Sequence, residues 1–126
     1  MIMRSYFKTT ILSSKCCIDF ELHLMKVDTT VQTFYLALLY RPPTGNVKTF
    51  LNYATDEVIP FCLDMKLYFM GDFNIQMNKG IECRKAQMLN EFLIENDLVQ
   101  HVDFPTHKQG NTLDLLITNS SISLIL

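Results

Sequence analysis

The feature that most constrains the fold is a change of hydrophobic period at the segment Arg41–Asn46, which reads Arg-Pro-Pro-Thr-Gly-Asn. Before it, apolar and polar residues alternate over Ile18–Met25, and Val31–Tyr40 ends in an apolar run, a pattern that predicts two strands. Val27–Thr30 is expected to be the turn that pairs them as an antiparallel hairpin. Two prolines cannot continue a strand ladder, so the second strand must stop at Tyr40.

Helical spacing begins after this segment. Asn46 is a suitable N-cap and Pro60 should end or kink the helix. The residues expected to face inward from this helix are Phe50, Leu51, Ala54, Val58, Phe61 and Cys62. The elements predicted next are a strand at 66–70, a helix at 82–95 and strands at 98–102 and 113–118.

This order of elements defines the expected fold class. Helices alternate with strands after an initial hairpin, which is typical of an α/β (α+β) protein with a mixed sheet. The second helix should bury Ala86, Leu89, Phe92 and Leu93 and should end at Asn96-Asp97. With 126 residues the chain corresponds to one domain or to part of one.

Composition excludes several classes of protein. Hydrophobic residues make up 48% of the chain and charged residues 19%, so the composition is that of a protein with a core rather than of a disordered one. The net charge of −2 gives no overall basic footprint for nucleic acid. The longest purely apolar run, Phe34–Tyr40, is too short to cross a bilayer, so we expect no membrane partner.

Four cysteines are present, and they form no Cys-x-x-Cys pair. Cys16, Cys17 and His23 are conceivable zinc ligands, but buried free thiols are the favoured interpretation of the cysteines. The N-terminal segment carries basic residues and lacks the continuous apolar stretch of a signal peptide. We therefore expect an intracellular protein of the nucleus or cytoplasm.

The stretch Tyr68–Asn74 holds the first candidate for chemistry. It ends in Gly71-Asp-Phe-Asn, and in an extended segment Asp72 and Asn74 would lie on one face. Gly71 would let another backbone or a phosphate approach closely. A carboxylate here can hold a metal or take a proton from water, and an amide can donate to a phosphoryl oxygen. By itself the motif favours an ordinary turn.

Asp114 is the second candidate, because it has leucine on both sides. Burying an unpaired carboxylate costs several kcal/mol, on the order of the whole stability of a domain. Asp114 therefore either faces outward from its strand, which periodicity favours, or has a partner such as a histidine or a metal. Tyr40, Thr106 and His107 are ordinary solvated residues on spacing alone.

The motifs together resemble those of the endonuclease/exonuclease/phosphatase family. The matching segments are Tyr-Arg-Pro-Pro at 40–43, Gly-Asp-Phe-Asn at 71–74 and the stretch 105–118. Within that family, the chain is most similar to the endonuclease domains of non-LTR (LINE-type) retrotransposons. The resemblance covers the chain from about Phe20 to its end, and it reverses the preference for a simple turn at Asp72 and Asn74.

The resemblance implies a four-layered α/β/β/α sandwich of two mixed sheets and the Mg²⁺- or Mn²⁺-dependent hydrolysis of phosphodiester bonds in DNA. It implies that Asp72 activates the attacking water and contributes to metal binding, and that Asn74 binds the phosphate. Tyr40 would contact the phosphate or the leaving oxygen, and Thr106 would help to fix the phosphate. Asp114 would orient a catalytic histidine.

The chain departs from the family pattern at both ends. We expect one partial domain over residues 1–126 that lacks the N-terminal strands with the family's asparagine and metal-binding glutamate, and the C-terminal Ser-Asp-His strand. Losing a stabiliser such as that histidine typically costs ~10²-fold or more in rate. We therefore expect a fragment that is inactive alone and whose open sheet edges invite self-association.

Three other interpretations stay open. One is a non-catalytic module that binds nucleic acid or a protein chain. Another is a small-molecule phosphoesterase, which the retroelement-like form of the loop at 105–113 disfavours. The last is a relic of a retrotransposon without a selected function.

Overall fold

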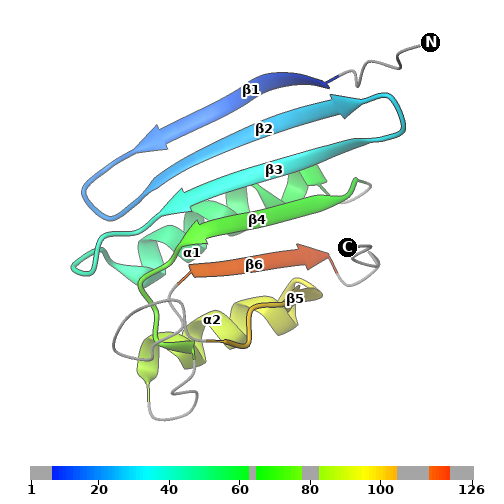
Figure 1. The fold of residues 1–126 in the computed structure, drawn as a ribbon. Coiled ribbons are helices and arrows are strands. Elements are labelled where there is room, and N and C mark those ends of the chain that lie inside the picture. Colours follow the sequence, from blue (N-terminus) through cyan, green and yellow to red (C-terminus); the bar gives the residue numbers. More distant parts are fainter. Residues whose placement is uncertain (1–6, 63–64, 78–82, 105–113, 120–126) are drawn as a thin grey trace.

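The computed structural model describes residues 7–62, 65–77, 83–104 and 114–119. Its elements are, in order, β1 (Phe7–Cys16), β2 (Glu21–Thr29), β3 (Thr33–Tyr40), α1 (Val47–Glu57), the short 3-10 helix η1 (Ile59–Cys62), β4 (Leu67–Asp72), α2 (Arg84–Glu95), β5 (Leu98–Gln100) and β6 (Asp114–Asn119). The strands form one six-stranded sheet in the order β1-β2-β3-β4-β6-β5 (Figure 1). The β3–β4 ladder is parallel and the other four are antiparallel. The predicted α/β (α+β) class and mixed, largely antiparallel sheet are confirmed.

One face of the sheet carries the core. Alternate residues of the inner strands pack there against α1, which lies behind the sheet in Figure 1, and against α2. The strand residues of this core are Leu22, Leu24, Ala37, Leu39, Leu67, Phe69, Leu98, Leu115 and Ile117, and Phe20 joins them from the position just before β2. The opposite face has no helix among the described residues, and we call it the helix-free face. The second sheet of a four-layered sandwich stays a prediction.

Helix α1 provides the crossover that the parallel β3–β4 pair requires. It begins where predicted, because the Asn46 side chain accepts a hydrogen bond from the Thr49 backbone N–H at 3.0 Å. It ends at Glu57, before Pro60, which lies in η1. Phe61 was expected to face inward and is exposed, because the chain has left the α-helix by that point. The crossover brings the carboxyl ends of β3 and β4 side by side.

Helix α2 agrees with the sequence expectation. Ala86, Leu89, Phe92 and Leu93 are buried on one face. Asn96 is the C-cap, and Asp97 takes a left-handed conformation with φ 58°, which explains why the helix stops there. None of the described helices is long and apolar enough to cross a membrane.

The N-terminal part of the sheet differs from the prediction. Strand β1 was not expected, and Val27–Thr29 belong to β2 rather than to a turn. The actual hairpin turn lies two residues further along the chain, at 29–32, where the Thr29 N–H donates to the Gln32 carbonyl at 2.8 Å. Ile18 was expected on the apolar face but is 88% exposed, because it lies in the β1–β2 connection.

The cysteines are also less buried than predicted. Cys16 and Cys17 are exposed, since they end the edge strand β1 and begin the following turn, and Cys83 is half-buried. Cys62 is buried, and this burial raises the pKa of its thiol to about 12. Its thiol is therefore a packing group rather than a nucleophile at neutral pH.

Candidate active site at the carboxyl ends of two parallel strands

Three of the predicted site residues form a row across neighbouring strands. Tyr40, at the end of β3, pairs with Asp72 at the end of β4, and Asp72 pairs with Asp114 at the start of β6. Strand residues alternate between faces, so these three side chains share the helix-free face, and neighbouring Cα atoms are about 5 Å apart. We call this set the polar row. It lies at the carboxyl ends of β3 and β4, where open α/β sheets bind ligands.

Asn74 reaches the polar row through a turn instead of by strand alternation. The expectation that an extended backbone aligns it with Asp72 is wrong, because β4 ends at Asp72 and Asn74 has φ 51°. The Asn74 backbone N–H donates to Asp72 Oδ1 at 3.1 Å, which makes an Asx turn. The turn and the site are therefore the same structure.

Gly71 sits where two strands approach too closely for a side chain. Its φ is +140°, and a Cβ added there would lie 1.9 Å from the Leu39 carbonyl oxygen. The sequence predicted that either a backbone or a phosphate would approach this glycine. In the structure the backbone of β3, at the Leu39 carbonyl, occupies the place that a side chain at position 71 would need.

A cavity of about 390 Å³ opens beside two members of the polar row. Its lining includes both carboxylates, Asp72 and Asp114, with Met70, Val102 and Phe104 around them. The half-buried position of Asp114 is consistent with the expectation that it faces out of the core. Two carboxylates on directly paired residues repel each other, and a cation bound between them would relieve that repulsion.

Arg41 is a site residue that the sequence did not reveal. It is 0% exposed, and its guanidinium donates to the carbonyls of Phe73 and Asn74, each at 2.7 Å, and of Gly45. Burial lowers the pKa of Arg41 and the Asp72 carboxylate opposes that shift. A buried arginine bound to backbone carbonyls 32 and 33 residues away leaves no local sequence signal.

Glu21 extends the polar row by one strand, since it pairs with Tyr40 from β2. Its carboxylate is hydrogen-bonded to His23 Nε2 at 2.9 Å, and this bond lowers the pKa of Glu21. The alternation of Ile18–Met25 was enough to place Glu21 on the polar face, but the β2–β3 register was needed to set it beside Tyr40. The predicted phosphate ligand Thr106 lies outside the described residues.

The same geometry decides how the described residues could hold a metal ion. Over residues 7–62, 65–77, 83–104 and 114–119, no group of three or more His, Cys, Asp or Glu side chains is arranged to hold a metal. Mg²⁺ often takes only one or two carboxylates and completes its shell with water and substrate phosphates. Asp72 and Asp114 fit that mode of binding, in which the substrate supplies part of the site.

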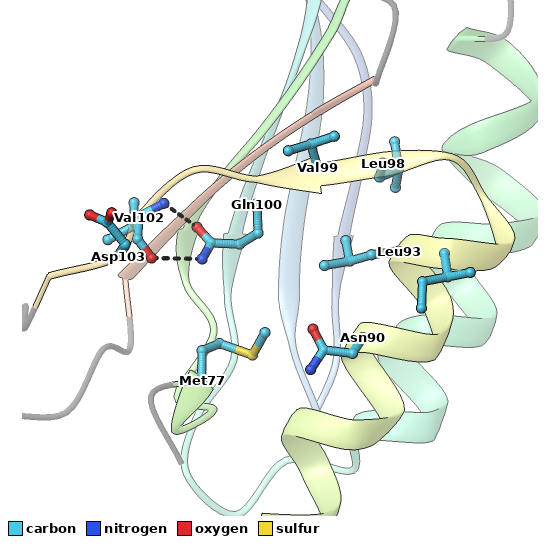
Figure 2. A pocket seen from close by; sticks show the side chains of 9 residues that line it. Met77, Asn90, Leu93, Leu98, Val99, Gln100, Val102 and Asp103 are labelled. Carbon is cyan, nitrogen blue, oxygen red and sulfur yellow. Dashed lines mark hydrogen bonds between the residues drawn. The ribbon is translucent and has the colours of Figure 1, made fainter. Parts of the chain in front are cut away.

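A larger cavity, of about 740 Å³, lies between α2 and β5 (Figure 2). The Gln100 side chain is hydrogen-bonded there to the segment that follows β5, donating to the Val102 carbonyl at 2.7 Å and accepting from the Val102 N–H at 2.6 Å. Leu93, Leu98 and Val99 supply apolar lining. None of the polar-row residues lines this cavity, although Val102 lines both this cavity and the one beside Asp72 and Asp114.

Comparison with solved structures identifies the fold. The endonuclease domain of TRAS1, a telomere-specific non-LTR retrotransposon, matches with a TM-score of 0.65 and 18% identity, over 79% of this chain and 48% of that one. A humanized D. rerio TDP2 with 14 mutations matches over 89% of this chain and 52% of its own, with 13% identity and a TM-score of 0.49. No protein-family model and no curated protein matches the chain.

The chain therefore has an endonuclease/exonuclease/phosphatase-like fold, as the sequence motifs indicated. It spans about half the length of the solved structures that it matches. The structural match to the retrotransposon endonuclease, at 18% identity, shows the fold alone, and a fold does not determine the chemistry of its site.

Proposed function

We propose that this chain is a retrotransposon-derived endonuclease-like domain whose site is built for metal-dependent hydrolysis of phosphodiester bonds in DNA. The observation that supports this most is the register of β3, β4 and β6, which aligns Tyr40, Asp72 and Asp114 beside the Asn74 turn. Three of these side chains lie at the ends of β3, β4 and β6, and the fourth lies in the turn after β4, so all four are at the same end of the sheet. We further propose that the 126 residues form a single partial domain and act in the nucleus or cytoplasm.

In the proposed reaction, Asp72 accepts a proton from the attacking water. The water oxygen bonds to phosphorus as the bond from phosphorus to the leaving oxygen breaks. Asn74 donates from its side-chain amide to a phosphate oxygen, since one of its two amide hydrogens is bound to the Arg41 carbonyl at 2.6 Å and the other has no acceptor among the described residues. The Tyr40 hydroxyl, on a side chain that is 47% exposed, donates to the phosphate or to the leaving oxygen.

Mg²⁺ or Mn²⁺, when bound, would neutralise charge on the phosphate. Asp72 would be the main protein ligand of the ion, and Asp114, which pairs with Asp72 on the neighbouring strand, would be the second carboxylate. Thr106 would help to fix the phosphate. Because the described residues offer no cluster of three ligands, the chain should bind the ion weakly without DNA. We therefore propose that the chain alone is inactive or nearly so.

Paramagnetic relaxation by Mn²⁺ tests the metal position without requiring turnover. In the presence of a short DNA duplex, the amide signals of Asp72 and Asp114 should broaden at lower Mn²⁺ than any others, because the substrate completes the coordination shell. Asp72→Ala should abolish this selective broadening. Asp28→Ala should leave it intact, because Asp28 pairs with Thr33 at the opposite end of the β2–β3 ladder from Tyr40. Broadening centred on other residues would contradict the proposed site.

Nicking of supercoiled plasmid in Mg²⁺ measures activity directly, with Asp72→Ala as the control. We expect no difference between the two proteins. Nicking by the wild type that Asp72→Ala loses would support the assigned chemistry and contradict the proposal that the chain is inactive alone.

A second candidate function, binding of a partner chain, is favoured by the helix-free face. Leu38 and Met70 are paired neighbours on it and are 36% and 39% exposed, with the half-buried Leu36 and Leu116 beside them. Adjacent exposed apolar side chains on one sheet face are typical of a surface that packs against another protein chain or another part of the same chain. The open edges β1 and β5 offer a second route to self-association, although β1 carries a register irregularity between Ile11 and Ser13, a feature that discourages edge pairing.

Light scattering over a range of protein concentrations tests this candidate. If the helix-free face mediates self-association, the wild type should form dimers that Leu38→Glu and Met70→Glu each reduce, because a charge would have to be buried. Dimers that persist in both variants would assign self-association to the edges. A wild type that stays monomeric throughout would remove the candidate.

A further inference from the structure

We propose that Arg41 is the positioning residue of the candidate active site and that it sets the conformation of Asn74 through a two-way clamp. The inference rests on the proposed function only for what Asn74 does with a phosphate. The clamp itself is argued from the contacts of Arg41 and can be tested without DNA.

The contacts run in both directions between two loops. The Arg41 guanidinium donates from Nε to the Phe73 carbonyl and from Nη2 to the Asn74 carbonyl, each at 2.7 Å. In return, Asn74 Nδ2 donates to the Arg41 carbonyl at 2.6 Å. The Arg41 N–H also donates to the Asp72 carbonyl at 2.9 Å, which continues the β3–β4 ladder into the loops.

These bonds fix the conformation that makes Asn74 useful. Asn74 is held at φ 51°, a region that costs free energy for a residue other than glycine and persists only where surrounding contacts enforce it. Arg41 reaches the backbone on both sides of the Phe73–Asn74 peptide and also grips the Asn74 side chain. The guanidinium also binds the Gly45 carbonyl, so the loop after Tyr40 is held by the same group.

The chemistry of the clamp requires arginine. A planar guanidinium presents donors in a rigid fork, and the three carbonyls engage all three of its nitrogens, one bond to each. Lysine would keep the charge but is a point donor on a flexible stem, so it cannot hold the three carbonyls in one geometry. Arg41→Lys should therefore leave the fold in place and loosen the Asn74 turn.

Asn119 provides a matched control at the opposite end of β4. Its side chain makes a comparable clamp, accepting from the Leu67 N–H at 2.7 Å and donating to the Met65 carbonyl at 3.0 Å. Asn119→Ala should loosen Leu67 without reaching Asn74. The two variants separate a local effect of Arg41 from a general loss of stability.

Amide hydrogen exchange by NMR is the deciding measurement. In Arg41→Lys, exchange at the Arg41-position and Asn74 amides should be at least about tenfold faster than in the wild type, with Leu67 unchanged. Asn119→Ala should show the reverse pattern. The Asn74 side-chain amide signal should also move in Arg41→Lys and stay in place in Asn119→Ala. Equal exchange at position 74 in Arg41→Lys and the wild type would overturn the clamp.

A DNA titration in the same samples links the clamp to the site. If the proposed function is right, a short duplex should shift the Asn74 side-chain signal, and its Kd should rise about tenfold in Arg41→Lys and not in Asn119→Ala. A wild type that shows no shift with DNA would count against the proposed function while the exchange result still decides the clamp. Tight binding preserved in Arg41→Lys, with a loosened turn, would contradict the positioning role.

Discussion

Replacing Gly71 with alanine is expected to destabilise the protein by about 3 kcal/mol or more, a large share of the margin of a typical domain. Two costs add. The φ of +140° is strained for any residue with a side chain, and the new Cβ would lie 1.9 Å from the Leu39 carbonyl oxygen, which belongs to the backbone and cannot rotate away. Urea unfolding followed by circular dichroism measures the loss. We expect a greatly lowered midpoint or a chain that does not fold.

Met70→Ala is the control for the Gly71 variant, because it alters the preceding residue of β4 on the exposed face. Removing its half-exposed side chain should cost about 1 kcal/mol or less. A Gly71→Ala protein as stable as Met70→Ala would show that β3 and β4 can move apart. In that event the close approach would not set the spacing of Tyr40 and Asp72.

Secondary structure could be predicted from the sequence where the hydrophobic period within a segment determines whether it forms a helix or a strand. Both helices and the strand predicted at 66–70 follow from patterns within single segments, and the β2–β3 pairing follows from two strand patterns joined by a short turn. Strand β1 was missed because Phe7–Cys16 is an edge strand with mostly exposed side chains, and such a strand shows no alternation to read. Its existence depends on pairing with β2, which is a tertiary effect.

In the candidate site, too, the sequence indicates what depends on single segments and not what depends on tertiary pairing. The residue types at positions 72, 74 and 114 indicated chemistry, but their alignment with Tyr40 depends on strand register across β3, β4 and β6. Period alone gave the wrong backbone at Asn74, where an Asx turn replaces the strand. Arg41 lies inside the Tyr-Arg-Pro-Pro motif, but the sequence does not predict its role, because its partners are backbone carbonyls distant in sequence.

Phe73 between the two polar residues explains how one short stretch can be both a turn and a site. Its ring is fully buried, 5.7 Å from the ring of Phe50 and 5.6 Å from that of Phe69. Phe73→Ala should cost about 3–5 kcal/mol, the usual loss for deleting a buried aromatic side chain, as measured by urea unfolding. Phe73→Leu should retain most of that stability, since it refills much of the volume.

The cavity left by Phe73→Ala should also act on the site, which separates this phenylalanine from others in the core. Phe20 is equally buried but its ring packs on Phe50 and Tyr53, whereas the ring of Phe73 packs on Phe50 and Phe69, so Phe20→Ala is the matched control. Amide exchange at Asn74 should accelerate more in Phe73→Ala than in Phe20→Ala after correction for global stability, because the first variant frees the peptide that Arg41 grips. Equal acceleration would mean that the turn is held by Arg41 and the Asx bond alone. A larger effect in Phe73→Ala would mean that packing of Phe73 in the core holds Asp72 and Asn74 in place at the end of β4.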